Sequence, residues 1–384
     1  RAGFVPGRED APGVAFLPRM NQTSTKPEVP AAVWSVNRWT FIWRILAVFA
    51  ISAASLYLLL YWTGNLAVFS QLPQVQLSWF LLAALVSAVT WLLDALANWF
   101  LLRGIGANLP FGWTLSANLA ANFVSYLTPF LAGGPPLFIY LLSRKGVSPG
   151  SAAMVVTARL TLSALIFMVL FPIFLALFQQ GISLSETWQR ILNLPFFLLG
   201  ALAVLILIFF LWRRSPGSYQ RFLAAWPMRV LLRREGFVRF WNWLLGELQK
   251  MGSAARILFT LGWANLIWAA LSIVVYWVAF YSVAPILLDS LAIPHPFLET
   301  FLGQAVLNAL VSLSPTPGGS GASELGFATL FMTWVPTQFI GIFTALWRFL
   351  IYYLTLFAGG ACFLFLASRE NLFRRTRPVN PPET

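Results

Sequence analysis

Ionisable residues stand within the apolar stretches of this chain, among them Asp94, Arg159, Glu324 and Arg348. An ionisable side chain at membrane depth is costly and marks a functional site by default. Two guanidinium groups that face one cavity would suit a phosphate, because arginine binds phosphate through two parallel hydrogen bonds. The arginines could instead be structural counter-ions, and Asp94 could pair with one of them or face the cavity. Glu324 could titrate a proton or gate a substrate, or could only cap a helix or pair with Arg348.

Two stretches close to these residues share one order of residue types: asparagine, hydroxyl, proline, two glycines, and later a lone arginine. The first reads NFVSYLTPFLAGG over 122–134, and the second reads NALVSLSPTPGGSGASE over 308–324. The order is made by Asn122 and Asn308, by Pro129 and Pro315, by Gly133–Gly134 and Gly318–Gly319, and by Arg159 and Arg348. The second stretch adds Pro317 and Gly321. One such match is weak, but the repeated order indicates an internal duplication.

Broken backbone has a definite use inside a membrane. Unpaired backbone groups survive there only where protein or a water-filled cavity receives them. Glycine permits positive φ and lets backbone N–H groups approach a ligand, and the helix N-terminus after each break attracts anions. The sequence therefore predicts a polar cavity that receives an anion. Asn122 and Asn308 are interpreted mainly as hydrogen-bond partners of the broken backbone.

Other reactive side chains are scarce. Cys362 stands in an apolar run and His295 between two prolines, and the chain has one residue of each type. We therefore expect no intramolecular disulfide, no metal site and no nucleotide-binding loop. The sequence predicts a protein without cofactor or enzymatic activity. The alternative is an integral membrane transferase on lipid-linked substrates, with Glu324 or Asp94 as general base.

Composition indicates an all-α integral membrane protein, because 59% of the residues are hydrophobic and 10% are charged. A helix needs about 20 residues to cross about 30 Å of hydrocarbon. Segments of that length lie at 40–62, 79–102, 151–178, 194–212, 256–284 and 337–367. Shorter apolar segments form two pairs, 113–128 with 135–142 and 297–313 with 322–334. We predict about six full transmembrane helices plus two re-entrant helical hairpins.

Charge assigns the two sides of the membrane. The net charge of +13 comes from arginines and lysines that crowd the ends of apolar segments, so it indicates topology rather than nucleic-acid binding. The linkers 63–78 and 285–296 carry no lysine or arginine. The positive-inside rule therefore places both termini in the cytoplasm. The first hairpin then enters from the cytoplasm and the second from outside, although short helices that span fully would leave the outer topology the same.

The predicted organisation has three parts. Residues 1–37 are expected to be a disordered cytoplasmic tail, 38–367 a membrane domain and 368–384 a basic cytoplasmic tail. Within the membrane domain, repeat A covers about 79–178 and repeat B about 256–367, in opposite orientations. Such an inverted-topology repeat is typical of transporters whose broken helices meet near the midplane. The segment 213–252 mixes aromatic residues with arginines and is predicted to lie on the cytoplasmic leaflet.

The two breaks resemble the signature regions of the lysylphosphatidylglycerol synthase transmembrane-region family, also called flippase-like, over about 40–367. The second break matches the pattern Pro-x-Pro-Gly-Gly-x-Gly-x-x-Glu through Pro315, Pro317, Gly318, Gly319, Gly321 and Glu324. The first region matches through Pro129, Gly133, Arg144, Lys145, Gly146 and Arg159. The family often has an acidic residue just before that arginine. Here Ala158 stands there, so no local carboxylate partner for Arg159 is visible.

The resemblance implies lipid handling. In bifunctional members this region flips a lipid to the outer leaflet while a separate soluble domain transfers the amino acid. Residues 368–384 leave no room for such a domain, so lipid aminoacylation by this chain alone is not expected. We expect a flippase of the bacterial inner membrane for a polar, anionic or phosphate-bearing lipid of phospholipid, polyprenyl or hopanoid type. A non-transporting, lipid-binding partner subunit of a lipid synthase is a further alternative, and a homodimer is left open.

Overall fold

The computed structural model describes residues 75–181, residues 235–369 except 312, 313 and 315, and single positions between 43 and 61. All regular structure in this part of the chain is helical. Four of its helices are long and apolar enough to cross a membrane: Leu77–Gly104, Pro149–Phe167, Trp263–Ser290 and Thr337–Arg369. They confirm four of the predicted spans. The predicted span 194–212 and nearly all of 40–62 lie outside the described residues, as do the tail 1–37 and most of 368–384.

The helices α2 (Leu77–Gly104) and α10 (Trp263–Ser290) form a long antiparallel pair. At one end the Gln76 N–H donates to the Ser290 carbonyl over 2.7 Å. At the other end a Cβ on Gly262 would stand 2.4 Å from the Gly104 carbonyl oxygen, so two glycines allow the backbones to touch. The span predicted to start at residue 256 begins at Trp263, because the preceding helix α9 ends and the chain turns at Gly262.

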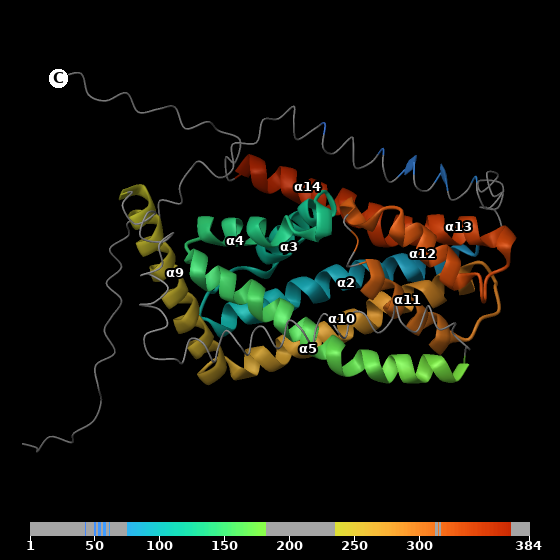
Figure 1. The fold of residues 1–384 in the computed structure, drawn as a ribbon, viewed down its shortest axis with the longest axis horizontal. Helices are drawn as coiled ribbons and strands as arrows, with labels where there is room; N and C mark the ends of the chain where they lie inside the picture. Colours follow the sequence, from blue (N-terminus) through green and yellow to red (C-terminus); the bar gives the residue numbers. More distant parts are fainter. Residues whose placement is uncertain are drawn as a thin grey trace, which may run out of the picture.

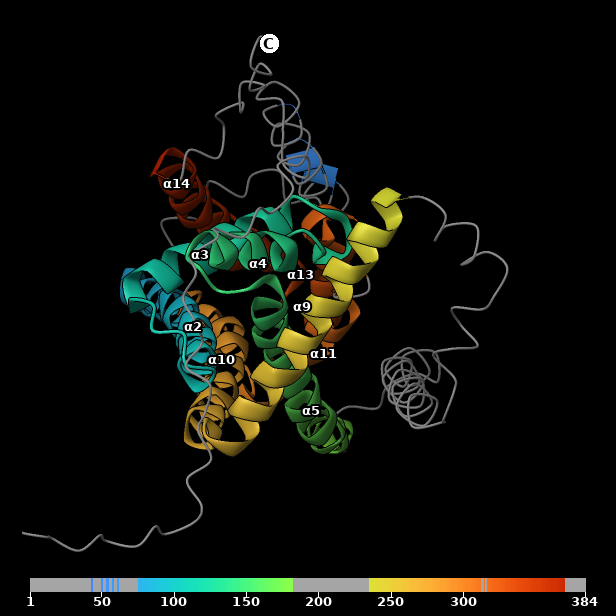
Figure 2. The same cartoon turned by 90° about the vertical axis from the view of Figure 1, so that its left-hand side faces the viewer.

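Helix α9 (Glu235–Thr260) crosses one end of the helical body at a steep angle (Figures 1 and 2). It covers the described part of the predicted interfacial segment 213–252 and continues beyond it to Thr260. The Glu247 carboxylate accepts a 2.6 Å hydrogen bond from the Gly150 N–H in the first turn of α5 (Pro149–Gly181). A Cβ on Gly150 would collide with the Glu247 carbonyl, so glycine is required for this close contact.

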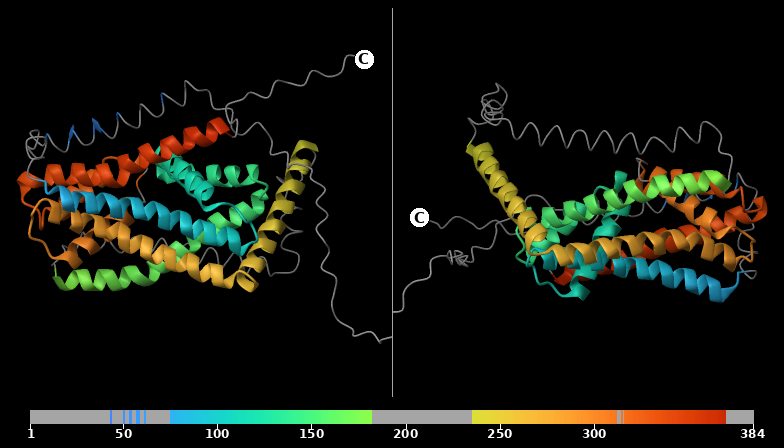
Figure 3. Two further views of the ribbon diagram at one scale, coloured as in Figure 1. Left: turned by 180° about the vertical axis from the view of Figure 1, so that it is seen from behind. Right: turned by 90° about the horizontal axis from the view of Figure 1, so that it is seen from below.

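Two pairs of short helices occupy opposite halves of the body. The first pair is α3 (Phe111–Tyr126) and α4 (Gly134–Arg144), and the second is α11 (Phe297–Val311) and α12 (Ala322–Phe331). Figure 1 shows α3 and α4 in the half next to α9, with α11 and α12 in the other half, and the views in Figure 3 agree. With about 1.5 Å of rise per residue, the 11 residues of α4 cover only half of a bilayer.

The short turns that break each pair, η3 (Pro129–Leu131) and η4 (Pro317–Gly319), contact one another. The last long span contacts the second of these turns through Arg348 and contains a π-helical turn of its own. It consists of α13 (Thr337–Arg348), the π-helical turn η5 (Phe349–Tyr353) and α14 (Leu354–Arg369). The breaks of two distant segments are thus brought together at the centre of the molecule.

Two apolar cores flank the meeting point. One is built from α10, α11, α12 and α13, with Phe327 stacked against Phe331 and Trp347. The other joins α3, α4, the first part of α5 and α14. There a Cβ on Gly359 would stand 2.4 Å from the Leu119 carbonyl oxygen, so α14 and α3 pack unusually close. Each half therefore holds its own hairpin, and the polar groups between the halves are positioned by both cores.

Candidate functional site

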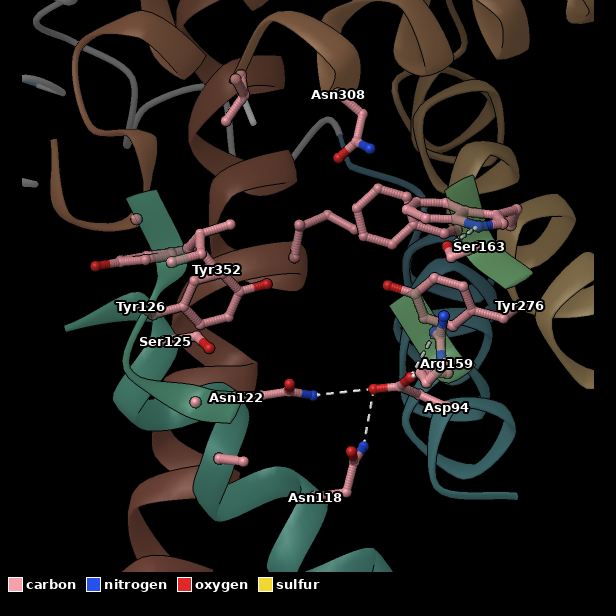
Figure 4. A pocket seen from close by; sticks show the side chains of 18 of the residues that line it. Asp94, Asn118, Asn122, Ser125, Tyr126, Arg159, Ser163, Tyr276, Asn308 and Tyr352 are labelled. Carbon is pink, nitrogen blue, oxygen red and sulfur yellow. Dashed lines mark hydrogen bonds and ion pairs between the residues drawn. The ribbon is translucent and has the colours of Figure 1, made fainter. Parts of the chain in front are cut away.

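A cavity of about 370 Å³ lies where the two breaks meet. Its wall is formed by side chains from α2, α3, α4, α5, α10, α11 and α13, together with both breaks (Figure 4). Asp94 in this wall stands ten residues from Gly104 at the end of α2, as 104 minus 94, which is about 15 Å along the axis. The cavity is therefore at the middle of the span, at the depth where polar side chains are most costly.

The most polar part of the wall is centred on Asp94. The Arg159 Nη2 and Nε atoms donate to Asp94 Oδ1 over 2.6 and 3.1 Å. The Asn118 and Asn122 side-chain amides donate to Asp94 Oδ2 over 2.8 and 3.2 Å. Figure 4 shows the two amides approaching from α3 while Arg159 approaches from α5. The carboxylate partner that the local sequence does not show for Arg159 is thus supplied by another helix.

The second intramembrane arginine is held differently. Arg348 Nε lies 3.0 Å from Glu324 Oε1 in an ion pair whose side chains are 4% and 0% exposed. Arg348 Nη2 donates to the Gly318 carbonyl and to Ser320 Oγ, both over 3.0 Å. The guanidinium also lies over the Tyr352 ring, 4.0 Å from its centroid. Arg348 therefore binds the backbone of the second break and also lines the cavity.

Glu324 performs both structural roles that the sequence left open. Its Oε2 atom accepts a 2.7 Å hydrogen bond from the Gly321 N–H and a 2.9 Å hydrogen bond from Ser323 Oγ at the start of α12. Its Oε1 atom pairs with Arg348. A carboxylate at a helix N-terminus satisfies backbone donors that would otherwise be unpaired. Glu324 does not belong to the cavity lining, and a titrating role for it stays untested.

The two breaks have the same local conformation, but in a register different from the predicted one. Pro129 opens one turn and Pro317 the other. The following residues have nearly equal dihedral angles, with φ 54° and ψ 19° at Phe130 and φ 58° and ψ 18° at Gly318. Pro129 therefore corresponds to Pro317 rather than to Pro315, which lies outside the described residues. The error arose because two prolines stand close together in the second break.

Threonine hydroxyls hold both turns. Thr128 Oγ1 accepts a 2.8 Å hydrogen bond from the Gly133 N–H, and Thr316 Oγ1 donates a 2.7 Å bond to the Ser320 carbonyl. Both threonines are extended, with ψ 147° and 148°. The register correction thus also pairs two threonines that each bind the backbone of their own turn, one as acceptor and one as donor.

The expected role of glycine is confirmed in one break only. Positive φ is found at Gly318, Gly319 and Gly321, with 58°, 66° and 86°. In the first break Phe130 and Leu131 take the positive values, whereas Gly133 has φ −78°. Gly134 is needed for space instead, because a Cβ there would collide with Ser125 Oγ and the Ala121 carbonyl.

The predicted backbone cradle for an anion stays a prediction, and several N–H groups of the breaks are already paired within the protein. In the second break the Gly321 N–H is used by Glu324 and the Gly319 N–H donates to the Thr316 carbonyl. At the start of α4, Pro135 and Pro136 have no N–H to offer. None of these four residues therefore offers a backbone N–H to a ligand.

Half of the predicted site residues face the cavity. The lining contains Asp94, Asn122, Gly134, Arg159, Asn308, Gly318 and Arg348. The residues Pro129, Gly133, Pro317, Gly319, Gly321 and Glu324 build the turns and are not part of the lining. Substrate binding by the lining residues stays a prediction. No group of three metal-ligating residues occurs in the part of the chain that the structure describes.

Sequence reasoning missed several polar lining residues, namely Asn98, Asn118, Ser125, Tyr126, Ser163, Tyr276, Gln304 and Tyr352. The repeat offered a signal for two of them, because Asn118 and Gln304 each stand four positions before the matched asparagines, as 122 minus 118 and 308 minus 304. Figure 4 shows the hydroxyl groups of Tyr126 and Tyr276 pointing toward each other across the cavity. No sequence pattern marked these tyrosines.

The Gln304 side chain binds two backbone groups of α10 that do not pair with each other. Pro285 stands inside that helix, and proline disturbs the hydrogen bonds of the preceding turn. The Gln304 Nε2 atom donates to the Phe280 carbonyl over 2.8 Å, and its Oε1 atom accepts from the Ala284 N–H over 2.9 Å. The amide of α11 is thereby inserted between a carbonyl and an N–H that would pair in a regular helix.

A polytopic α-helical membrane protein with a polar cavity inside its spanning region is the class that this fold and site define. The chain belongs to the family described as the lysylphosphatidylglycerol synthase TM region, whose sequence pattern matches residues 45–359. It is also similar to a UPF0104 membrane protein from Archaeoglobus fulgidus. The two are 29% identical over 286 residues, which is 73% of this chain and 85% of that protein. The family predicted from the two breaks is therefore confirmed.

Proposed function

We propose that this protein moves a phosphate-bearing lipid across the membrane, with the headgroup in the central cavity and the acyl chains in the surrounding bilayer. The observation that carries the proposal is the Arg159–Asp94 pair in the wall of a mid-span cavity. A cavity of about 370 Å³ is large enough for a headgroup, because small-molecule sites occupy roughly 300–1,000 Å³. The name of the family refers to a synthase of a modified phospholipid, which favours a lipid over a sugar or an ion.

The two structural halves suit this task. We propose that α2–α5 and α10–α14 form an inverted-topology repeat and that the hairpins are re-entrant. Support comes from the antiparallel α2 and α10, and from the hairpins in opposite halves whose breaks touch. Rocking of one half against the other would open the cavity to each leaflet in turn. Leu160 supports a lateral opening, because it lines the cavity and is also 57% exposed.

The orientation follows from charge. Arg103, Arg144 and Lys145 end α2 and α4 in the half next to α9, whereas Asp289 and Glu299 stand near the opposite end. We propose that the α9 end faces the cytoplasm, in agreement with the positive-inside rule, and that the membrane is a plasma membrane.

Translocation can be measured in phosphatidylcholine vesicles that contain the purified protein and a fluorescent short-chain phosphatidylglycerol. The outer-leaflet fraction is read by extraction to albumin. We expect exchange between leaflets well above that of protein-free vesicles, and at least a tenfold loss in Arg159→Gln. Arg256→Gln is the matched control, since Arg256 is exposed on α9 outside the cavity lining. Exchange equal to that of empty vesicles would contradict the proposal.

A further inference from the structure

A second, smaller cavity adjoins the first behind Asp94. It has a volume of about 30 Å³ and is lined by Ser87, Thr90, Trp91, Asp94, Asn122, Tyr126, Tyr276, Phe280, Ile351 and Thr355. We call it the inner chamber. A polar space of this volume holds one water molecule, because about 10–15 Å³ of probe-occupied volume is sufficient. Asp94 and Asn122 line both cavities, so the carboxylate stands between the inner chamber and the headgroup cavity.

Two hydroxyl groups of the inner chamber, those of Ser87 and Thr90, are arranged to accept hydrogen bonds. Ser87 Oγ donates to the Leu350 carbonyl over 2.9 Å, and Thr90 Oγ1 donates to the Ser87 carbonyl over 2.6 Å. Each hydroxyl has one hydrogen, so only acceptor lone pairs remain for the chamber. Both side chains are buried, with 1% and 4% exposure. A water molecule in the chamber would donate to these hydroxyls and lie beside Asp94.

Charge balance limits what the headgroup cavity can accept. The titratable and charged groups that face Asp94 are Arg159 from α5, Tyr126 from α3 and Tyr276 from α10. Arg348 and Tyr352 of the last span lie across the cavity, and Glu324 pairs with Arg348. The two ion pairs leave the empty site neutral. An anionic headgroup that enters such a site brings an uncompensated charge, which is costly at membrane depth. One proton on Asp94 would restore neutrality and release Arg159 to bind the phosphate.

We infer that Asp94 carries one proton with each phosphate-bearing lipid, and that the inner chamber holds the water molecule that exchanges this proton. The inference rests on the proposed function and names its coupling ion. In the loaded state Asp94 is neutral and Arg159 pairs with the phosphate. After the lipid leaves, the proton passes from the carboxyl group to the chamber water, and the Arg159–Asp94 pair forms again. Lipid-for-lipid exchange needs no release of the proton, whereas net movement of lipid does.

The test uses the same vesicles in sodium-free buffer with a pH gradient of one unit. The wild type should concentrate fluorescent phosphatidylglycerol in the leaflet on the alkaline side, up to about tenfold per pH unit, since one unit is about 1.4 kcal/mol. A membrane potential alone should have no effect, because the proton and the anionic lipid together are neutral. Exchange without leaflet asymmetry would overturn the inference but not the proposed function. Asymmetry that appears only when a sodium gradient replaces the pH gradient would also overturn it, and absence of exchange would overturn both.

Two variants separate a loss of proton exchange at Asp94 from a loss of folding. Asp94→Asn should retain exchange at a reduced rate and lose gradient-driven accumulation completely. In Thr90→Val, the loss of gradient-driven lipid accumulation should exceed the loss of lipid exchange at least tenfold. Thr344→Val is the matched control, because Thr344 is equally buried and donates to the Ile340 carbonyl but lines neither cavity. Equal losses of accumulation and exchange in Thr90→Val, or full accumulation by Asp94→Asn, would overturn the inference.

Discussion

The two halves of the molecule place an arginine at the same cavity and hold it in opposite ways. Arg159 pairs with Asp94, which comes from a different helix, and their side chains are 12% and 14% exposed. Arg348 pairs with Glu324, which also comes from another helix of the same half but caps the start of α12, and their side chains are 4% and 0% exposed. The first pair can therefore open toward a ligand without unfolding the backbone. The second pair fixes the turn that follows Pro317, which is the contrast expected if, as proposed, the first break binds the headgroup and the second supports the fold.

The strongest challenge to this contrast is removal of each arginine. Arg348→Gln should lower the free energy of unfolding by about 3–5 kcal/mol, because Glu324 is left buried without its partner. Arg159→Gln should cost only about 1–3 kcal/mol, since two asparagine amides still bind Asp94. Unfolding in detergent, followed by tryptophan fluorescence, measures both. Equal losses of unfolding free energy in the two variants would show that the two ion pairs stabilise the fold equally.

A methyl group in the second break should be almost as harmful. In Gly318→Ala the new Cβ would stand 2.2 Å from Tyr352 Cε2 at φ 58°, so we expect a loss of about 2–4 kcal/mol from overpacking and backbone strain. Gly112→Ala is the matched control in α3, where a Cβ meets nothing within 4 Å. That change should stabilise the helix by about 0.5–1 kcal/mol. The same unfolding assay compares the two, and a small effect of Gly318→Ala would mean that the turn is not a rigid support.

The corresponding amides Asn118 and Gln304 extend the comparison to the neighbouring helices. Gln304→Leu should cost about 1–3 kcal/mol, because the Ala284 N–H and the Phe280 carbonyl lose a buried partner. Asn118→Leu should cost less stability and more translocation, since Asn118 binds the Asp94 side chain rather than backbone. The unfolding and vesicle assays together decide this. Full translocation by Asn118→Leu would contradict the assignment of the first half to binding.

The smallest expected effect comes from the strained residue in the first break. Phe130 has φ 54° and is 61% exposed, so Phe130→Gly should raise the free energy of unfolding by about 1 kcal/mol. Phe357→Gly offers the opposite control, because Phe357 is 60% exposed but lies within α14. Phe357→Gly should lower the free energy of unfolding by about 1 kcal/mol. If both variants lose stability equally, Phe130 contributes packing that outweighs its strain.

The sequence was sufficient for the four spans that the structure describes, for the two breaks and for the position of both arginines at the cavity, because long apolar runs, proline with glycine and isolated charges are local signals. A pair between Asp94 and one of the arginines was left open, but the choice of Arg159 was out of reach, since it joins residues 65 positions apart. The lack of an N–H on Pro135 and Pro136 in the first turn of α4 could have been predicted from the sequence, but these prolines were interpreted only as favourable for a helix start. The role of Gln304 depends on a distortion in another helix, which no pattern around Gln304 records.

The π-helical turn η5 lets one span serve two different neighbours. Before it, Ile340, Phe343 and Trp347 belong to the core of α10, α11 and α12, and after it Leu356 and Phe363 belong to the core of α3, α4 and α5. A helix of constant pitch keeps its apolar stripe on one side, whereas the wider turn shifts the stripe around the axis. Deleting one residue from η5 would therefore realign the two stripes and misdirect everything beyond the deletion. The length of this span is thus fixed by the direction in which its two ends must face, as well as by the thickness of the bilayer.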